Sequence, residues 1–298
     1  MLRWGVLGAA QIAGRAVLPA IAASGNGRLV AIASRDVARA EAMAAPYRGV
    51  RVIESYDALL ADAEVEAVYI PLVNSEHKRW TLRALQAGKH VLCEKPLATN
   101  AHDAEVMATQ AQASQRLLME AFMYHFHPDM QAFVEDLTDP IHVEASFGFM
   151  LGDQTNHRLQ APLGGGALLD VGCYTISVAR WILGEPSEVI AAARIVRDVD
   201  LSVNILLLFG GGQTASLWAS LESPEVQDLK VVTRHRVHRR DRPFTSWKDP
   251  HDPYQLMIES FGDSVMKNLP AAIPPSESIA NLRVIDRIRE SAVLNLGL

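Results

Sequence analysis

The first 121 residues alternate short apolar runs with stretches of helical periodicity, and this alternation most limits how the chain can fold. Strands are expected at residues 2–7, 29–33, 50–53, 65–72, 90–93 and 117–121, and helices at 12–23, 37–45, 76–87 and 101–112. Such alternation forms parallel sheets, and strands that are apolar along their whole length are covered on both faces. We therefore predict an α/β fold with a doubly wound parallel sheet, in a domain of residues 1–121.

The pattern changes after residue 121. Strands are expected at residues 141–149, 188–196, 201–209, 214–221 and 229–233, and helices at 167–183, 254–267 and 277–291. The three glycines at 210–212 form a turn between two of these strands. Successive strands joined by short turns predict an antiparallel sheet in an α+β domain of residues 122–298.

Composition argues against several classes of protein. The 298 residues carry 28 Lys and Arg against 34 Asp and Glu, a net charge of -6, which argues against a nucleic-acid partner. The two cysteines, Cys93 and Cys173, give no disulfide framework and favour a reducing cytoplasm. No run approaches about 18 apolar residues, and Gln11 and Arg15 interrupt the apolar start of the chain, so we expect neither a membrane span nor a signal peptide.

A turn of small residues joins the first expected strand to the first helix. Gly8 permits a tight turn, and Ala10 and Ala13 stand where dinucleotide-binding turns carry two further glycines. Such a turn points the free amides of a helix N-terminus at a pyrophosphate. The residues expected to line a cofactor here are Gly8, Ala10, Gln11 and Ile12. Because the motif is incomplete, a turn of small residues without a ligand is the open alternative.

The second expected strand ends in Ser34 and Arg35. NAD-binding proteins place an acidic residue about 20 residues beyond the glycines to bind the ribose 2′-hydroxyl, whereas a hydroxyl and a guanidinium suit a phosphate. NADP is therefore favoured over NAD, and Arg39 lies one helical turn further on to assist. Asp36 is the competing acidic residue, but a helix N-cap accounts for it.

Two further clusters have plain structural explanations. His125 and His127 have no carboxylate cluster beside them, so we expect no metal site. The run from Arg234 to Arg242 (RHRVHRRDR) is strongly basic and could face a phosphate or a nucleic acid. A solvent-exposed sheet edge protected by charge is favoured for it.

Four motifs are spread over the chain: residues 88–96 (GKHVLCEKP), 119–124 (MEAFMY), 164–174 (GGGALLDVGCY) and 252–254 (DPY). Together they resemble the family of glucose–fructose oxidoreductase, inositol dehydrogenase and rhizopine catabolism (Gfo/Idh/MocA). Within it the chain is most similar to the branch of dimeric dihydrodiol dehydrogenases and NADP-dependent aldose dehydrogenases. The resemblance covers nearly the whole chain. It implies a Rossmann domain followed by a domain with an open, mostly antiparallel sheet, and hydride transfer at a carbinol carbon or a sugar's anomeric carbon.

The resemblance also assigns roles to residues. Glu94 would contact the nicotinamide ribose, and Lys95 would reach the substrate hydroxyl. The residues that would lie along the cofactor are Pro71, Leu72, Asn74 and His77. Asn156 and Arg158 resemble the branch's substrate loop. Arg158 would hold substrate hydroxyls or neutralise a surface carboxylate, and both alternatives are open.

The chemistry of hydride transfer agrees with these roles. Loss of a hydride from a carbinol carbon requires the hydroxyl proton to leave as well, so a base must lie within hydrogen-bond reach. The phenol of Tyr174 has an ordinary pKa of about 10, and a nearby ammonium such as Lys95 lowers a phenol's pKa. Lys95 also follows a strand, and α/β proteins bind ligands at the carboxyl ends of their strands.

Asp170 lies four residues before Tyr174 and therefore shares its helix face. There it would bind a substrate hydroxyl or steady Lys95. The alternative is a helix N-terminal carboxylate that satisfies free amides.

The predicted function is NADP-dependent oxidation of a sugar, polyol or vicinal diol, or the reverse reduction. Tyr174, where many relatives have histidine, indicates the dihydrodiol and aldose branch, whereas His125 stands where that branch tends to carry arginine. A glycosidase that uses bound nicotinamide and a non-catalytic NADP-binding redox sensor are the alternatives. The open sheet has a large face that needs cover, so a homodimer through it is expected.

Overall fold

A computed structural model describes residues 1–153, 155–245, 251–291 and 293–295, and the chain divides into two compact units. The first unit consists of Met1–Ala98, His102–Pro128 and the described part of Ser246–Ser278. The second consists of Thr99–Ala101, Asp129–Thr245 and the described part of Ile279–Leu298. The predicted domain boundary between residues 121 and 122 stays a prediction.

Six parallel strands form the sheet of the first unit, in the order β3-β2-β1-β4-β5-β6. They are β1 (Leu2–Leu7), β2 (Gly27–Ala33), β3 (Arg51–Ile53), β4 (Ala67–Ile70), β5 (His90–Cys93) and β6 (Leu118–Glu120). The side chains of the central strands are buried almost completely, as their apolar sequences require. The predicted doubly wound parallel sheet is confirmed.

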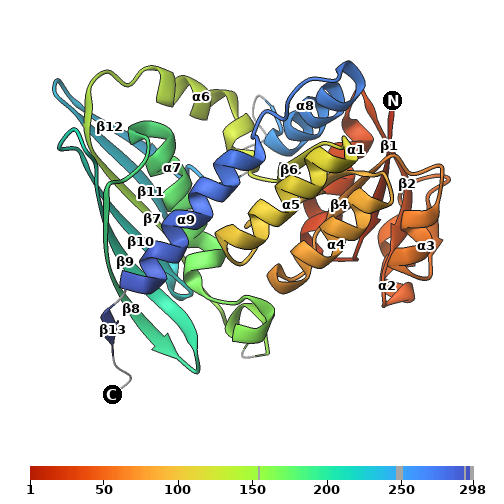
Figure 1. Cartoon of the computed structure of the whole chain (residues 1–298), viewed down its shortest axis with the longest axis horizontal. Helices are drawn as coiled ribbons and strands as arrows, with labels where there is room; N and C mark the ends of the chain where they lie inside the picture. The colour runs from red at the N-terminus through yellow and green to blue at the C-terminus, as the bar shows by residue number, and fades with distance from the viewer. Residues whose placement is uncertain (154, 246–250, 292, 296–298) are drawn as a thin grey trace. The chain divides into compact units, whose positions relative to one another are not determined.

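Helices join the consecutive strands of this sheet (Figure 1). They are η1 (Ala13–Val17), α1 (Leu18–Ala23), α2 (Val37–Ala44), α3 (Tyr56–Ala61), α4 (Asn74–Gln86) and α5 (Ala101–Ser114), and two further helices, η2 (Met123–Phe126) and α8 (Pro253–Lys267), come after β6 in the chain. The helix predicted at 12–23 begins with the wide π-type turns of η1. Pro19, which has no amide hydrogen, lies two residues after Val17, where these turns end. The Asp36 side chain accepts a hydrogen bond from the Arg39 amide at 3.0 Å, which confirms the predicted cap of α2.

The second unit contains a seven-stranded sheet in the order β12-β11-β7-β10-β9-β8-β13. Its strands are β7 (Pro140–Met150), β8 (Glu188–Val196), β9 (Val199–Leu208), β10 (Thr214–Ser220), β11 (Glu222–Thr233), β12 (Val237–Asp241) and β13 (Val293–Asn295). All neighbours are antiparallel except the pairs β7–β10 and β8–β13, so the predicted mostly antiparallel sheet is confirmed. β11 begins seven residues earlier than predicted (222 against 229), because a register shift between Glu222 and Val226 interrupts its alternation.

The helices of this part of the chain are α6 (Pro128–Glu135), η3 (His157–Leu159), η4 (Ala161–Leu163), η5 (Leu168–Gly172), α7 (Cys173–Leu183) and α9 (Pro275–Ser291). α7 crosses one face of the sheet over β7 and β10 (Figure 1). Ala167 and Val171 pack there against Ala219 and Leu221. Among the described residues, one helical stretch, Ala161–Leu183, is long and apolar enough to cross a membrane, but 83% of its apolar window is buried within the protein.

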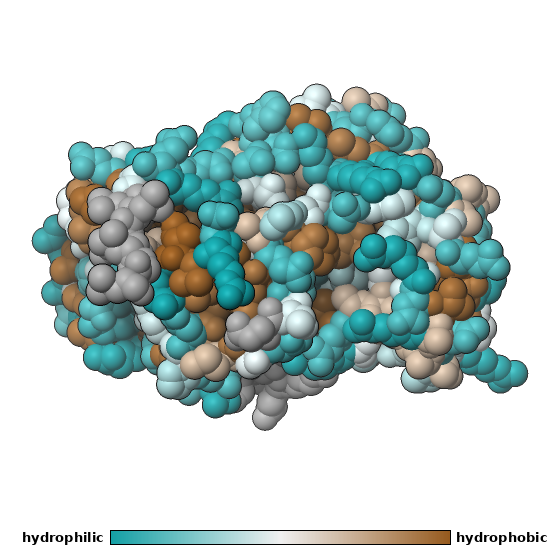
Figure 2. Space-filling model, turned by 90° about the horizontal axis from the view of Figure 1, so that it is seen from below, coloured by the Kyte–Doolittle hydropathy of each residue, from teal (hydrophilic) through white to brown (hydrophobic). Residues whose placement is uncertain are grey.

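The surface carries no single kind of side chain. Figure 2 shows hydrophobic areas set among hydrophilic ones on the face that it presents. Among the large hydrophobic side chains of the sheet, Met150 is 61% exposed, Ile190 54% and Val237 53%.

Candidate active site

The turn after β1 is built around Gly8, whose φ of +121° disfavours any residue with a side chain. Its amide donates to the Ala33 carbonyl at 2.7 Å, and a Cβ at this position would lie 2.8 Å from Leu72 Cδ2. Gly14, one residue beyond the motif, packs closely against Met43, since a Cβ there would lie 3.1 Å from Met43 Cε. The backbone at Gly8 can therefore approach a ligand closely, which fits a pyrophosphate.

Ser34 and Arg35 follow the carboxyl end of β2, beside the Gly8 turn. Ser34 Oγ accepts the Asp36 amide at 3.1 Å, and the exposed Arg35 and Arg39 side chains stand on the same stretch of chain. Burial raises the pKa of Tyr56, while the Arg35 guanidinium beside its hydroxyl acts in the opposite direction. Asp36 caps α2, and the guanidinium groups of Arg35 and Arg39 outnumber its one carboxylate, so the set fits a 2′-phosphate.

The loop after β5 carries Glu94 and Lys95. Glu94 Oε1 accepts a hydrogen bond from the Tyr69 hydroxyl at 2.5 Å, and Glu94 Oε2 accepts the Lys95 amide at 3.2 Å. Tyr69 is fully buried, and burial, followed by the charge of Glu94, raises its pKa. The same two causes raise the pKa of Tyr254, the first one again being burial. The Glu94 carboxylate is thus held in one orientation beside two buried phenols.

His77 ties two of these loops together. The ring is fully buried, with Nδ1 2.8 Å from the Pro96 carbonyl and Nε2 2.9 Å from the Leu72 carbonyl. Burial lowers the pKa of His77, and the two carbonyls oppose this. Both ring nitrogens face backbone, so His77 fixes the loops after β4 and β5. A direct contact of His77 with the cofactor stays a prediction, as do contacts of Pro71, Leu72 and Asn74.

Glu120 is a buried carboxyl that the sequence interpretation missed. It ends β6, is 2% exposed, and accepts the Leu97 amide on Oε1 at 2.8 Å. Burial raises its pKa from 4.5 to about 7. In the sequence, residues 119–124 (MEAFMY) indicate the family resemblance, and they carry no pattern that predicts a structural role for Glu120.

In the second unit Asp170 lies in η5 and Tyr174 in the first turn of α7. Arg158 Nε donates to Asp170 Oδ2 at 2.7 Å, and the Arg158 amide donates to Asn156 Oδ1 at 3.0 Å. Asp170 is 8% exposed, so Arg158 neutralises a buried carboxylate rather than a surface one. Asn156 and Arg158 thus lie at the start of η3, and Asp170 and Tyr174 lie on the helical segment η5–α7 of the same unit.

Aromatic rings pack around Tyr174. Its ring centroid is 5.4 Å from that of Phe147 and 5.4 Å from that of Phe244, and these two phenylalanines stack at 5.3 Å. Tyr174 is 7% exposed. Its ring therefore has little freedom to turn, and its hydroxyl direction is set by packing.

The glycines before η5 allow two close approaches. A Cβ at Gly165 would lie 2.4 Å from the Arg158 carbonyl oxygen, and one at Gly166, where φ is +115°, would lie 2.1 Å from Asp200 Oδ1. Asp200 Oδ2 accepts the Leu168 amide at 2.6 Å and so caps the helical segment that carries Asp170. Burial raises the pKa of Asp200 to about 6, against the effect of that amide. No pattern in the sequence separates Asp200 from its neighbour Asp198.

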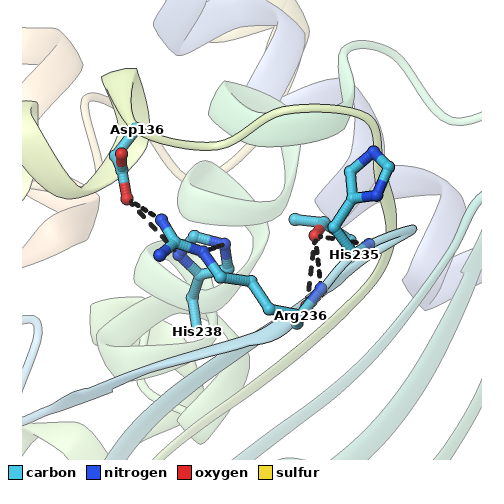
Figure 3. A network of polar contacts seen from close by, with 5 residues as sticks. Asp136, His235, Arg236 and His238 are labelled. Carbon is cyan, nitrogen blue, oxygen red and sulfur yellow. Dashed lines mark hydrogen bonds and ion pairs between the residues drawn. The ribbon is translucent and has the colours of Figure 1, made fainter.

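The basic run lies on β12, the edge strand of its sheet, and on the turn before it, as predicted. Figure 3 shows Arg236 between Asp136 and His238: its Nη2 pairs with the Asp136 carboxylate, and its Nε donates to His238 Nε2 at 3.0 Å. Arg240 faces Asp129 at 3.5 Å. Carboxylates of the α6 region thus balance part of this charge. In the described part of the chain no cluster of His, Cys, Asp and Glu could hold a metal ion.

The structure therefore gathers the expected cofactor residues at the carboxyl ends of β1, β2, β4 and β5, all within the first unit. It gathers the expected substrate residues around η5 within the second. Lys95 and Tyr174 belong to different units, so their action as a pair stays a prediction.

Comparison with known proteins identifies the family. The model of the Gfo/Idh/MocA oxidoreductase family with an NAD-binding Rossmann fold matches residues 2–122, and the model of the Gfo/Idh/MocA C-terminal domain matches residues 134–238. The chain belongs to this family, and the predicted resemblance is confirmed.

Individual relatives are similar over about three quarters of the chain or more. A D-xylose 1-dehydrogenase (NADP(+)) from Haloferax volcanii is 36% identical, over 98% of this chain and 97% of that protein. A trans-1,2-dihydrobenzene-1,2-diol dehydrogenase from Mus musculus is 36% identical over 74% of this chain and 69% of that protein. The structure of a mutant 3-ketoreductase from Actinomadura kijaniata, in complex with TDP-benzene and NADP, matches with a TM-score of 0.93 and 32% identity, covering 98% of each chain.

The close approach at Gly166 gives a stability prediction. In Gly166→Ala the new Cβ collides with the Asp200 carboxylate and φ is strained, so we expect the free energy of unfolding to fall by about 3 kcal/mol or more. Gly212→Ala, which has a φ of +84° but open space, should lose about 1 kcal/mol. Gly210→Ala, in open space, should change by less than about 0.5 kcal/mol. Urea unfolding of the three variants measures this, and equal losses would contradict the packing around Asp200.

Proposed function

We propose that Tyr174 and Lys95 perform the proton transfer in this enzyme, which is an NADP-dependent oxidoreductase of sugars or diols. That class, which the sequence predicted, is confirmed by the named activities of the relatives and by the NADP in the structure of the 3-ketoreductase from Actinomadura kijaniata. The observation that carries the proposed roles is the loop after β5, which is held at Glu94 by Tyr69 and at Pro96 by His77. A lysine on so fixed a loop, at the carboxyl end of a parallel sheet, is suited to orient a substrate.

The chemistry assigned to NADP is to accept or give the hydride. Tyr174 removes the proton of the reacting hydroxyl during oxidation and returns it during reduction. The Lys95 ammonium favours the phenolate form of Tyr174 and donates a hydrogen bond to the substrate oxygen. The rings of Phe147 and Phe244 keep the Tyr174 ring in place while it does so.

Arg158 and Asp170 are proposed to bind the hydroxyl next to the reacting one. Arg158 Nε donates its hydrogen bond to Asp170. Within the described residues, the two terminal nitrogens of the Arg158 guanidinium have no hydrogen-bond partner. A guanidinium fixed on one edge presents its other donors in a defined direction, which suits two oxygens on neighbouring carbons. With Asn156 beside it, this arrangement favours a vicinal diol within a sugar, polyol or dihydrodiol.

The proposed cofactor contacts follow the edge of the parallel sheet. The backbone from Gly8 through Ala10, Gln11 and Ile12 would hold the pyrophosphate. Ser34, Arg35 and Arg39 would hold the 2′-phosphate, and Glu94 the nicotinamide ribose.

Cofactor selection tests the phosphate site. Arg35→Ala should weaken NADPH binding about tenfold or more, because a charge-assisted hydrogen bond to phosphate is lost, and should leave NADH binding unchanged. Ser34→Ala should act in the same direction. Arg28→Ala is the matched control, since Arg28 is an exposed arginine near the amino end of the same strand. Fluorescence titration measures the affinity of each of the four proteins for NADPH and for NADH, and an equal loss for the two cofactors in Arg35→Ala would contradict the assignment.

Turnover tests the proton-transfer roles. Tyr174→Phe should lower kcat for oxidation of aldoses or diols by about 100-fold or more while NADPH still binds, since general acid–base catalysis contributes about that much. Lys95→Met should show a similar loss, and Tyr47→Phe is the control tyrosine. Full function in Tyr174→Phe would instead support the redox-sensor alternative, and sugar release without net change of cofactor would support the glycosidase.

We also propose that the chain forms a homodimer through the open face of the second sheet. On the face away from α7, Ile190 of β8 lies opposite Leu206 of β9, which in turn lies opposite Ser216 of β10. Two further large side chains on these strands, Leu208 and Trp218, are only half-buried. Sedimentation should give about twice the 32.6 kDa of one chain. The double variant Ile190→Glu and Leu206→Glu should be monomeric, because it places charge in a dry interface, while Met266→Glu should not change the mass. A monomeric wild type would contradict the proposal.

A further inference from the structure

Glu120 lies directly beside the strand that leads into the Lys95 loop. It pairs with Cys93 in the register of β5 and β6, and the Ala121 amide donates to the Cys93 carbonyl at 2.8 Å. Glu120 Oε1 accepts the Leu97 amide, two residues after Lys95. One strand thus supplies a carboxyl that reaches across to the loop of the next.

The second oxygen, Glu120 Oε2, is buried and makes no hydrogen bond of ordinary geometry to any described residue, although the Ser278 hydroxyl lies close enough to the carboxyl to act against the rise of its pKa. A buried carboxyl with an unsatisfied oxygen is destabilising, and an apolar side chain of similar size would cost less. Holding one amide does not require a charge, because a neutral amide side chain would accept the same hydrogen bond. The position therefore calls for a role for the charge itself.

We propose that Glu120 is a positioning residue for Lys95, fixing its loop through the Leu97 amide and, when ionised, providing the negative charge that keeps the Lys95 ammonium in place. The proposal rests on the role assigned to Lys95 under the proposed function. It adds a residue that touches neither cofactor nor substrate and acts through the loop.

The groups around Glu120 make this charge responsive to pH. They are Glu94 and Lys95 from the loop, Cys93 from β5 and Ser278 from α9. Burial raises the pKa of Glu120 to about 7, and Glu94 acts in the same direction, while the Ser278 hydroxyl, the Leu97 amide and Lys95 act against it. Below this value the side chain is neutral, and above it the charge is present.

Glu120→Gln separates charge from shape, because glutamine keeps an acceptor for the Leu97 amide. The ratio of kcat for wild type to kcat for Glu120→Gln should be about 1 below pH 6, where both side chains are neutral, and should rise to about 10 above pH 8. KM for NADP should stay within about twofold. Glu41→Gln, on the exposed face of α2, is the control and should give a ratio near 1 throughout. A ratio that does not change with pH would overturn the proposal.

A measurement without turnover keeps this test independent of the proposed function. Competitive acetylation with acetic anhydride, read by mass spectrometry, reports the reactivity of Lys95 in the protein alone. At pH 8 the Lys95 amine should react about threefold or more faster in Glu120→Gln, because loss of the carboxylate favours the uncharged amine. Equal reactivity in the two proteins would overturn the proposal. If no variant and no wild type turns over any aldose or diol, the proposed function fails while this labelling still decides the role of Glu120.

Discussion

The loop after β5 depends on three hydrogen bonds that arrive from three different elements. Tyr69 of β4 holds the Glu94 side chain, His77 of α4 meets the Pro96 carbonyl, and Glu120 of β6 accepts the Leu97 amide. Each partner is buried, so water does not compete for these bonds. Lys95 lies within this short segment. The three hydrogen bonds therefore fix the backbone at Lys95, and with it the direction of the Lys95 side chain, before any ligand binds.

In the second unit a helical segment, and not a loop, fixes the positions of the candidate site residues. Asp200 caps the segment that begins at Leu168, and the missing side chain of Gly166 makes room for that carboxylate. Asp170 and Tyr174 then follow on the same helical segment, where Arg158 balances the charge of the former and phenylalanines surround the ring of the latter. Pre-organised groups of this kind need little reorganisation during a reaction.

The sequence predicted the elements whose signals are local. β1, β5 and β8 were predicted to the residue, because each is an unbroken apolar or alternating run. α3 was missed, since six residues capped by Ser55 show too little periodicity, and α4 begins two residues before the prediction because its N-terminus has no side-chain cap.

The same distinction applies to the candidate site. Gly8, Ser34 and Arg35 were predicted as cofactor contacts from their place in the chain order of strands and helices, and those contacts stay predictions. Glu120 and Asp200 were not, because their roles come from amides 23 and 32 residues away that only the folded chain brings near. The contact of His77 with the Pro96 carbonyl, 19 residues away, also depends on the folded chain, whereas its contact with the Leu72 carbonyl spans only five residues.

Tyr174 and Lys95 are proposed to act on one substrate oxygen beside NADP. A crystal structure of the chain with NADP and an unreactive sugar or diol analogue tests it most directly. We expect one analogue oxygen within about 2.6–3.2 Å of both Tyr174 Oη and Lys95 Nζ, with the 2′-phosphate on Ser34 and Arg35. An analogue oxygen in contact with neither side chain, or a 2′-phosphate bound elsewhere, would contradict it.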